Sequence, residues 1–228
     1  PVSLRFVKSS WYLKLAQLLV AWSLTVSLNV LQAYVSCVTT WLFGLVNWIL
    51  LSALKMTRRK LLKALNVQES PWLFGHSDGG SIALLFATRH ATAGVIVLAP
   101  HIKVEDISVK SIAIAKETYE NTDLRQRLNR YHADVDSAFW GWSRIWLAPE
   151  FRNWSIENEL SSITCPVLAI QGINDEYGSL AQIRNIQRHV PHTQLVEIDH
   201  CGHSPQRDQP HALTQACLTF FKAHALSC

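Results

Sequence analysis

The segment at residues 75–80, Gly-His-Ser-Asp-Gly-Gly, limits the possible folds of this chain more than any other feature. It follows the short apolar run 72–74 and precedes the apolar residues 81–86, an order typical of strand, sharp turn and helix. Such a turn strains the backbone of its serine, and the flanking glycines let the strand and the helix pack closely. We therefore predict that Ser77 projects its hydroxyl from a nucleophile elbow at the carboxyl end of a strand.

A serine hydroxyl becomes a good nucleophile only when a base removes its proton. Residues 193–198 alternate like a strand and lead into Asp-His-Cys-Gly-His-Ser-Pro at 199–205. His203 lies beside a glycine and ahead of a helix that we expect to begin near Pro210, and it is our preferred base. His200 is the alternative. The other histidines, among them His76, His90 and His101, are expected to be surface or core residues.

The base also needs an orienting acid. Residues 163–170 form a β-rich apolar run, and Asp175 follows just beyond its carboxyl end. Glu176 and Asp199 are alternatives. Because neighbouring side chains on an extended segment point in opposite directions, only one of Asp175 and Glu176 can face His203, and we favour Asp175.

These segments together resemble the α/β-hydrolase family over roughly residues 60–225. The order Ser77, Asp175, His203 matches the order of a serine triad on an open α/β sheet. The resemblance implies an α/β fold with a mainly parallel sheet, flanking helices and a helical cap. It implies hydrolysis of an ester, thioester or related acyl bond of a small-molecule substrate, with the backbone N–H of Asp78 donating to the oxyanion. It implies no cofactor or metal.

A cap is expected at residues 101–161, between a strand at 94–99 and the β-rich run. Helical spacing occurs at 110–119 and 122–132. Aromatic residues gather at the end of this region and are candidate walls of a pocket, since such pockets are mostly apolar; the three candidates are Trp140, Trp142 and Trp146. The alternative is that these side chains form the core of the cap itself.

The amino-terminal segment, residues 1–57, is atypical. No Asp or Glu precedes Glu69, and residues 15–54 carry no charged side chain. This run is long enough for two membrane-spanning helices, and basic residues flank both of its ends. A membrane hairpin is therefore one interpretation, with possible membrane contact through residues 15–54. A sequence translated out of frame and a divergent set of core elements are the others.

The second oxyanion donor has no visible candidate, because Gly44 is the only glycine before Gly75. We thus expect an α/β-hydrolase domain at 58–228 that acts as a serine hydrolase. The alternative is a membrane-attached or truncated relative with impaired or no catalysis. We expect a cytoplasmic protein or, with a hairpin, one anchored with this domain on the cytoplasmic side.

Composition excludes some classes of partner and site. The net charge of +4 arises at the amino-terminal end and is not the footprint of a nucleic-acid-binding protein. The five cysteines are scattered without paired C-x-x-C spacing, so the sequence predicts neither a zinc site nor a disulfide framework.

Overall fold

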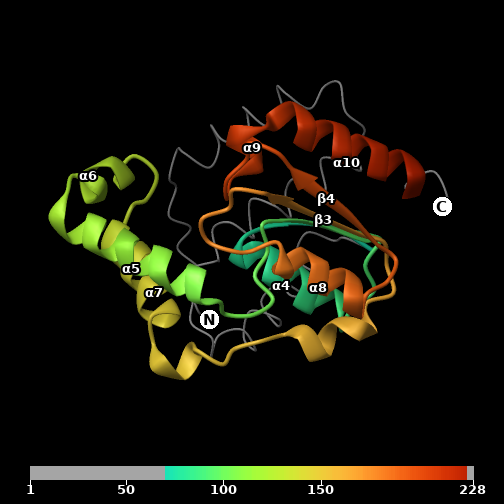
Figure 1. Ribbon diagram of the computed structural model, residues 1–228, viewed down its shortest axis with the longest axis horizontal. Coiled ribbons are helices and arrows are strands. Elements are labelled where there is room, and N and C mark those ends of the chain that lie inside the picture. Colours follow the sequence, from blue (N-terminus) through green and yellow to red (C-terminus); the bar gives the residue numbers. More distant parts are fainter. Residues whose placement is uncertain (1–69, 225–228) are drawn as a thin grey trace, which may run out of the picture.

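The computed structural model describes residues 70–224, in which a four-stranded parallel sheet lies between two layers of helices (Figure 1). The strands pair in the order of the chain. They are β1 (Trp72–His76), β2 (Gly94–Leu98), β3 (Val167–Gly172) and β4 (Thr193–Ile198). Every neighbouring pair is parallel, so all four carboxyl ends lie at one edge of the sheet. The predicted α/β class is confirmed.

Helices cover both faces of this sheet (Figure 1). One face packs against α4 (Asp78–Ala87) and α8 (Ala181–His189), and the other packs against α10 (Pro210–His224), which follows the short α9 (Pro205–Asp208). Parallel strands that are covered on both faces read as continuous apolar runs, and every residue of β2 and β3 is buried.

Alternation along the central strands divides the core into two clusters. Val95 and Val97 face the α4 and α8 side, whereas Ile96 and Leu98 face the α10 side. Successive side chains of a strand point to opposite faces, so one short apolar strand supplies both clusters. The core therefore fixes the sheet, and with it the positions of the strand ends.

A helical excursion lies between β2 and β3, beside the sheet (Figure 1). It consists of α5 (Asp106–Asn121), α6 (Leu124–Leu128), α7 (Val135–Trp146) and two 3-10 turns, η1 (Pro149–Phe151) and η2 (Glu157–Ser162). Buried side chains of Tyr119, Val135 and Phe139 give it a core of its own. It occupies the region in which the sequence places a cap.

The helices of this region differ from those that the sequence predicts. The helical spacing at 122–132 corresponds to a shorter helix, Leu124–Leu128. After Leu128 the chain continues in hydrogen-bonded turns, in which the N–H groups of Tyr131 and His132 donate to the Leu128 carbonyl. Arg125 forms an ion pair with Asp136, and Tyr119 donates its hydroxyl to the same carboxylate at 2.6 Å, so these contacts join α5, α6 and α7.

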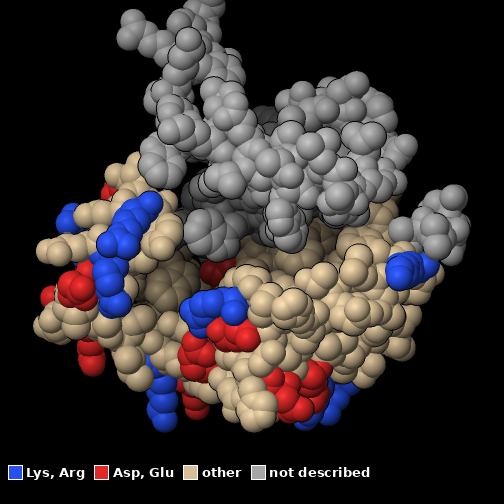
Figure 2. Space-filling view, turned by 90° about the horizontal axis from the view of Figure 1, so that it is seen from above, with Lys and Arg blue, Asp and Glu red and all other residues tan. Residues whose placement is uncertain are grey.

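The amino-terminal segment 1–57, including the candidate membrane spans within 15–54, lies outside the described residues. Within 70–224, no helix combines the length and the apolar character needed to cross a bilayer. On the described surface in view, Figure 2 shows Lys and Arg interspersed with Asp and Glu, with no large patch of one sign.

Candidate active site

Ser77 lies in a sharp turn between the end of β1 and the start of α4. Its backbone has φ 54° and ψ −126°, a positive φ that residues other than glycine seldom adopt. Its N–H donates to the carbonyl oxygen of Leu98 at 2.9 Å, which ties the turn to β2. A side chain at Gly75 would collide with the backbone of Gly79, so glycine is required where the strand and the helix meet. The structure therefore has the geometry of the predicted elbow.

Ser77, His203 and Asp175 form a continuous hydrogen-bonded series. Nε2 of His203 lies 3.0 Å from Oγ of Ser77, and its Nδ1 lies 2.9 and 3.1 Å from the two carboxylate oxygens of Asp175. A carboxylate only accepts, so Nδ1 carries the ring proton and Nε2 is free to accept the serine proton. The three residues follow β1, β4 and β3, whose carboxyl ends share one edge of the sheet.

The carboxylate of Asp175 is held in its ionised form. The residue is only 6% exposed, and its oxygens accept from the Gln171 side chain at 3.0 Å and from the Tyr177 N–H at 2.8 Å. Burial by itself would raise its pKa. The hydrogen bond and charge of His203, together with the other donors, outweigh burial and hold the pKa of Asp175 below its usual range.

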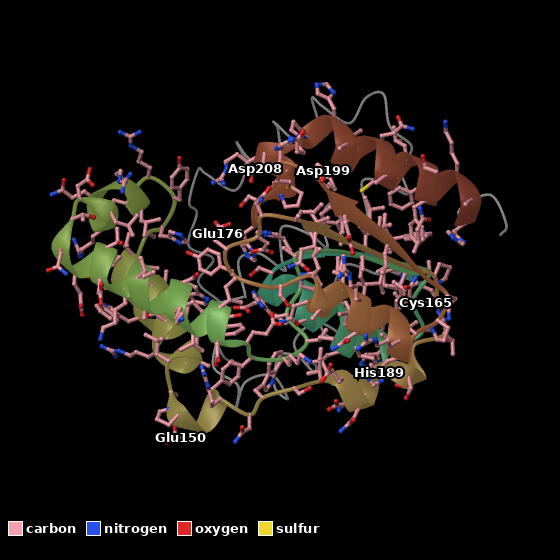
Figure 3. The ribbon with its side chains drawn as sticks, in the orientation of Figure 1. Glu150, Cys165, Glu176, His189, Asp199 and Asp208 are labelled. Carbon is pink, nitrogen blue, oxygen red and sulfur yellow. The ribbon has the colours of Figure 1, made fainter. Side chains whose placement is uncertain are left out.

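The alternative acids and base lie elsewhere. Glu176 binds the backbone of His203, since its Oε2 accepts from the His203 N–H at 3.1 Å, whereas the ring bonds to Asp175. Asp199 and His200 are exposed at the turn after β4, and the carbonyl of His200 accepts from the Gln209 side chain at 3.2 Å. Figure 3 places Glu176 in the loop after β3 and Asp199 beside α9.

Two further histidines, expected to be surface or core residues, lie against His203. The ring centroids of His76 and His101 are 4.9 and 5.7 Å from that of His203. Burial lowers the pKa of His76 to about 4 and that of His101 to about 3, and nearby His203 acts in the same direction, so both rings are neutral near pH 7. Their positions at or just beyond a strand's carboxyl end are the sequence signal that could have identified them.

Of the three candidate pocket tryptophans, Trp146 alone makes a described contact with the elbow. Its Nε1 lies 3.4 Å from a carboxylate oxygen of Asp78, and its ring packs 4.8 Å from that of His101. Trp140 and Trp142 pack instead against the buried cluster of the helical excursion. Burial raises the pKa of Asp78 to about 6, although the Trp146 hydrogen bond lowers it.

The start of α4 supplies N–H groups beside Ser77. The helix begins at Asp78, and the first N–H groups of a helix have no partner within it. The Asp78 N–H is therefore suited to bind an oxyanion. A second donor from an early loop would come from residues before 70, outside those described.

Comparison with known proteins identifies the family. The model of the alpha/beta hydrolase family matches residues 29–216, so this chain belongs to that family. The match begins within the atypical segment 1–57. Membership of this family supports the conclusion that the protein is a hydrolase. No curated protein matches the chain.

Solved structures of similar fold include several hydrolases. A carboxylesterase of the ammonia-oxidizing Thaumarchaeon Nitrososphaera gargenis has 16% identity and a TM-score of 0.63, covering 78% of this chain and 74% of that one. A thermophilic esterase from Thermogutta terrifontis has 22% identity and a TM-score of 0.51, covering 72% and 69%. An alpha/beta hydrolase from a Medee basin deep-sea metagenome library has 22% identity and a TM-score of 0.56, covering 74% and 70%. At these identities the likeness concerns the fold.

Proposed function

We propose that this chain is a serine hydrolase that cleaves an ester, thioester or related acyl bond of a small molecule through an acyl-enzyme. The observation that carries the proposal is the series of hydrogen bonds from Ser77 through His203 to Asp175. The elbow backbone supports it further, since that conformation exposes the serine at the strand ends. Family membership and the esterase folds are consistent with it.

In the acylation step, Oγ of Ser77 attacks the carbonyl carbon of the substrate while Nε2 of His203 takes the hydroxyl proton. The carbonyl oxygen becomes an oxyanion, to which the backbone N–H of Asp78 donates. Collapse of this intermediate breaks the acyl bond. The leaving group takes the proton from His203, and the acyl group stays on Ser77.

In the second step, water replaces the leaving group. The water oxygen attacks the acyl carbon while His203 takes a proton from the water. His203 then gives this proton to Oγ of Ser77 as the acid product leaves. Asp175 holds the imidazole in the reactive tautomer and stabilises its positive charge. No redox change occurs, so this chemistry requires no electron carrier.

In this proposal the substrate approaches between the elbow and α7. Trp146 lies at this position and is proposed as an apolar wall of the acyl pocket, while Asp78 and His101 add polar groups beside it. Trp140 and Trp142 keep a candidate pocket role in this proposal, although their described contacts lie within the helical excursion.

The test is turnover of short-chain nitrophenyl esters by the full chain, compared with Ser77→Ala. We expect the wild type to show a burst of nitrophenol followed by steady turnover, because nitrophenol is a good leaving group and hydrolysis of the acyl-enzyme is then the slower step. Ser77→Ala should lose the burst and nearly all turnover. Equal rates for the two proteins would reject the serine mechanism and favour the impaired relative that the sequence leaves open.

A further inference from the structure

The backbone of His203 is held on both sides by side chains that have no role in the chemistry above. Nε2 of His76 donates to the carbonyl oxygen of His203 at 2.7 Å. The N–H of His203 donates to Oε2 of Glu176 at 3.1 Å. His76 directly precedes Ser77, and Glu176 directly follows Asp175. Ser77 and Asp175 therefore bind the ring of His203, and the residues next to them in the chain, His76 and Glu176, bind its backbone.

The loop that carries His203 depends on such contacts. Residues 199–204 lie in neither a helix nor a strand. Within this loop, the N–H of Gly202 donates to Asp208 at 3.0 Å, and the carbonyl of Cys201 accepts from the Asn174 N–H at 2.9 Å. An irregular loop has no ladder of backbone bonds, so side chains and neighbouring loops must set its position.

The two contacts suit their positions chemically. A carbonyl oxygen only accepts, so His76 carries its ring proton on Nε2. Burial lowers the pKa of His76 to about 4 and keeps the ring neutral near pH 7. A neutral ring can donate this bond without placing a second positive charge beside the imidazolium that His203 forms during catalysis.

We infer that His76 and Glu176 are positioning residues that fix the backbone of His203, and so the approach of its ring to Ser77 and Asp175. The inference rests on the proposed function of His203 as the base. Figure 3 shows Glu176 in the loop after β3, on the same side of the molecule as Asp208. Neither residue is proposed to touch the substrate.

The experiment compares a removal and a conservative replacement at each position. His76→Leu removes the donor, whereas His76→Gln places an amide N–H near the position of Nε2. Glu176→Leu removes the acceptor, whereas Glu176→Gln keeps an oxygen that can accept from the His203 N–H. His76→Asn has a polar side chain that is too short to reach the His203 carbonyl. It replaces His76→Leu in the experiment if the leucine variant does not fold.

Two control variants remove contacts that lie outside the hydrogen bonds of His203. His192 also donates a ring N–H to a backbone carbonyl, that of Cys165, at 2.9 Å. Figure 3 shows Cys165 at the end of the sheet opposite Glu176. Glu197 is paired with Arg184 on the exposed side of β4 and α8. His192→Leu and Glu197→Leu should keep the wild-type kcat.

We expect the two leucine variants and His76→Asn to lose about 10- to 100-fold in kcat with KM changed less than about twofold, because small displacements of a reacting group are costly while binding is not. The glutamine variants should recover most of the lost rate. A wild-type kcat in the removal variants, glutamine variants as slow as the leucine variants, or a loss confined to KM would overturn the inference.

A spectroscopic measurement separates this inference from the proposed function. The proton between His203 Nδ1 and Asp175 should give a low-field ¹H NMR resonance whether or not the protein turns over a test ester. We expect it to broaden by exchange in the leucine variants and to persist in the glutamine variants and controls. If the resonance broadens only in the leucine variants of a protein without esterase activity, the positioning role is supported and the proposed function is rejected. If the resonance is unchanged in the leucine variants of an active enzyme, the positioning role alone is rejected.

Discussion

At the scale of single residues, the site stores strain in its backbone and balances it with hydrogen bonds between strands. Ser77 and Ala99 have positive φ values of 54° and 43°, although neither is glycine. Such conformations cost on the order of 1–3 kcal/mol each. The Ser77 N–H donates to Leu98 and the Ala99 N–H donates to Ile170, so each strained residue is bonded to the neighbouring strand. The sheet therefore holds Ser77 in the orientation that the proposed chemistry requires.

The role proposed for Asp175 predicts the effect of a single-atom change. In Asp175→Asn, the side-chain amide can donate to Nδ1 and so favour the tautomer with the proton on Nε2, which cannot accept the serine proton. We expect kcat to fall by roughly 10³–10⁴ near pH 7. Steady-state rates on a nitrophenyl ester measure the effect.

Asp199→Asn is the matched control, since Asp199 is one of the two alternative acids in the sequence and is exposed. It should keep the wild-type rate. A similar loss of kcat in both variants would show that the acid has been assigned wrongly.

At the scale of elements, the end of β3 lies against the loop that carries the base. A side chain at Gly172 would collide with the backbone carbonyls of Cys201 and Gly202. Because backbone atoms cannot rotate away as a side chain can, the loop would have to shift, and His203 would shift with it. The absence of a side chain at this strand end is thus a condition for the geometry of the site.

Gly172→Ala is therefore expected to lower kcat by at least about tenfold, because the base is displaced, in addition to lowering the free energy of unfolding by about 1–3 kcal/mol. Gly94→Ala is the comparison, since its added methyl would meet the Trp72 side chain at the start of β2, at the opposite end of the sheet. It should reduce stability but leave kcat per folded molecule unchanged. Equal losses of kcat in both variants would contradict the proposed link to His203.

At the scale of the whole molecule, buried titratable groups link stability to pH. The pKa values of His76 and His101 are lowered from 6.5 to about 4 and about 3 by burial, so between pH 4 and 6.5 the unfolded state binds more protons at these positions. Their contribution makes the free energy of unfolding rise with pH across this window. Asp78, whose pKa burial raises from 3.8 to about 6, acts oppositely, and its contribution is lost as pH rises from 4 to 6.

The contributions of the two histidines are thus opposed by that of Asp78 alone. We expect a net increase in the free energy of unfolding from pH 4 to 6.5, measured by urea unfolding. His101→Phe should make this increase smaller, and Asp78→Asn should make it larger. The same pH dependence in all three proteins would mean that these groups are accessible to water in the folded state.

The amino-terminal segment gives a further prediction for the whole chain. The family match begins at residue 29 and so includes most of the uncharged run 15–54, as expected if these residues belong to the hydrolase domain. We therefore expect carbonate extraction of expressing cells to release the full chain into the soluble fraction. Recovery in the membrane pellet would favour the hairpin. Reading the encoding DNA in all frames tests the out-of-frame interpretation, since another frame over residues 1–57 that encodes a glycine-containing loop able to supply the second oxyanion donor would identify a shift.

Much of the fold could be predicted because its signals are local. The alternating run 193–198 is β4 with the same bounds, and the helix expected near Pro210 begins there as α10. The expected strand at 94–99 ends one residue earlier, at Leu98. The helices between β2 and β3 were harder to predict, because the ion pair of Arg125 with Asp136 joins residues on two different helices and leaves no periodic pattern.

The sequence by itself determined the elbow and the order of serine, acid and histidine, because both follow from residue types at short range and from chain order. Only the tertiary structure decided that Asp175 meets the His203 ring while Glu176 binds its backbone, and that His76 and His101 lie beside that ring. These outcomes depend on how the loops that follow separate strands approach one another at the sheet edge. Packing between helices and strands sets the directions of these loops, and no short stretch of sequence encodes that packing.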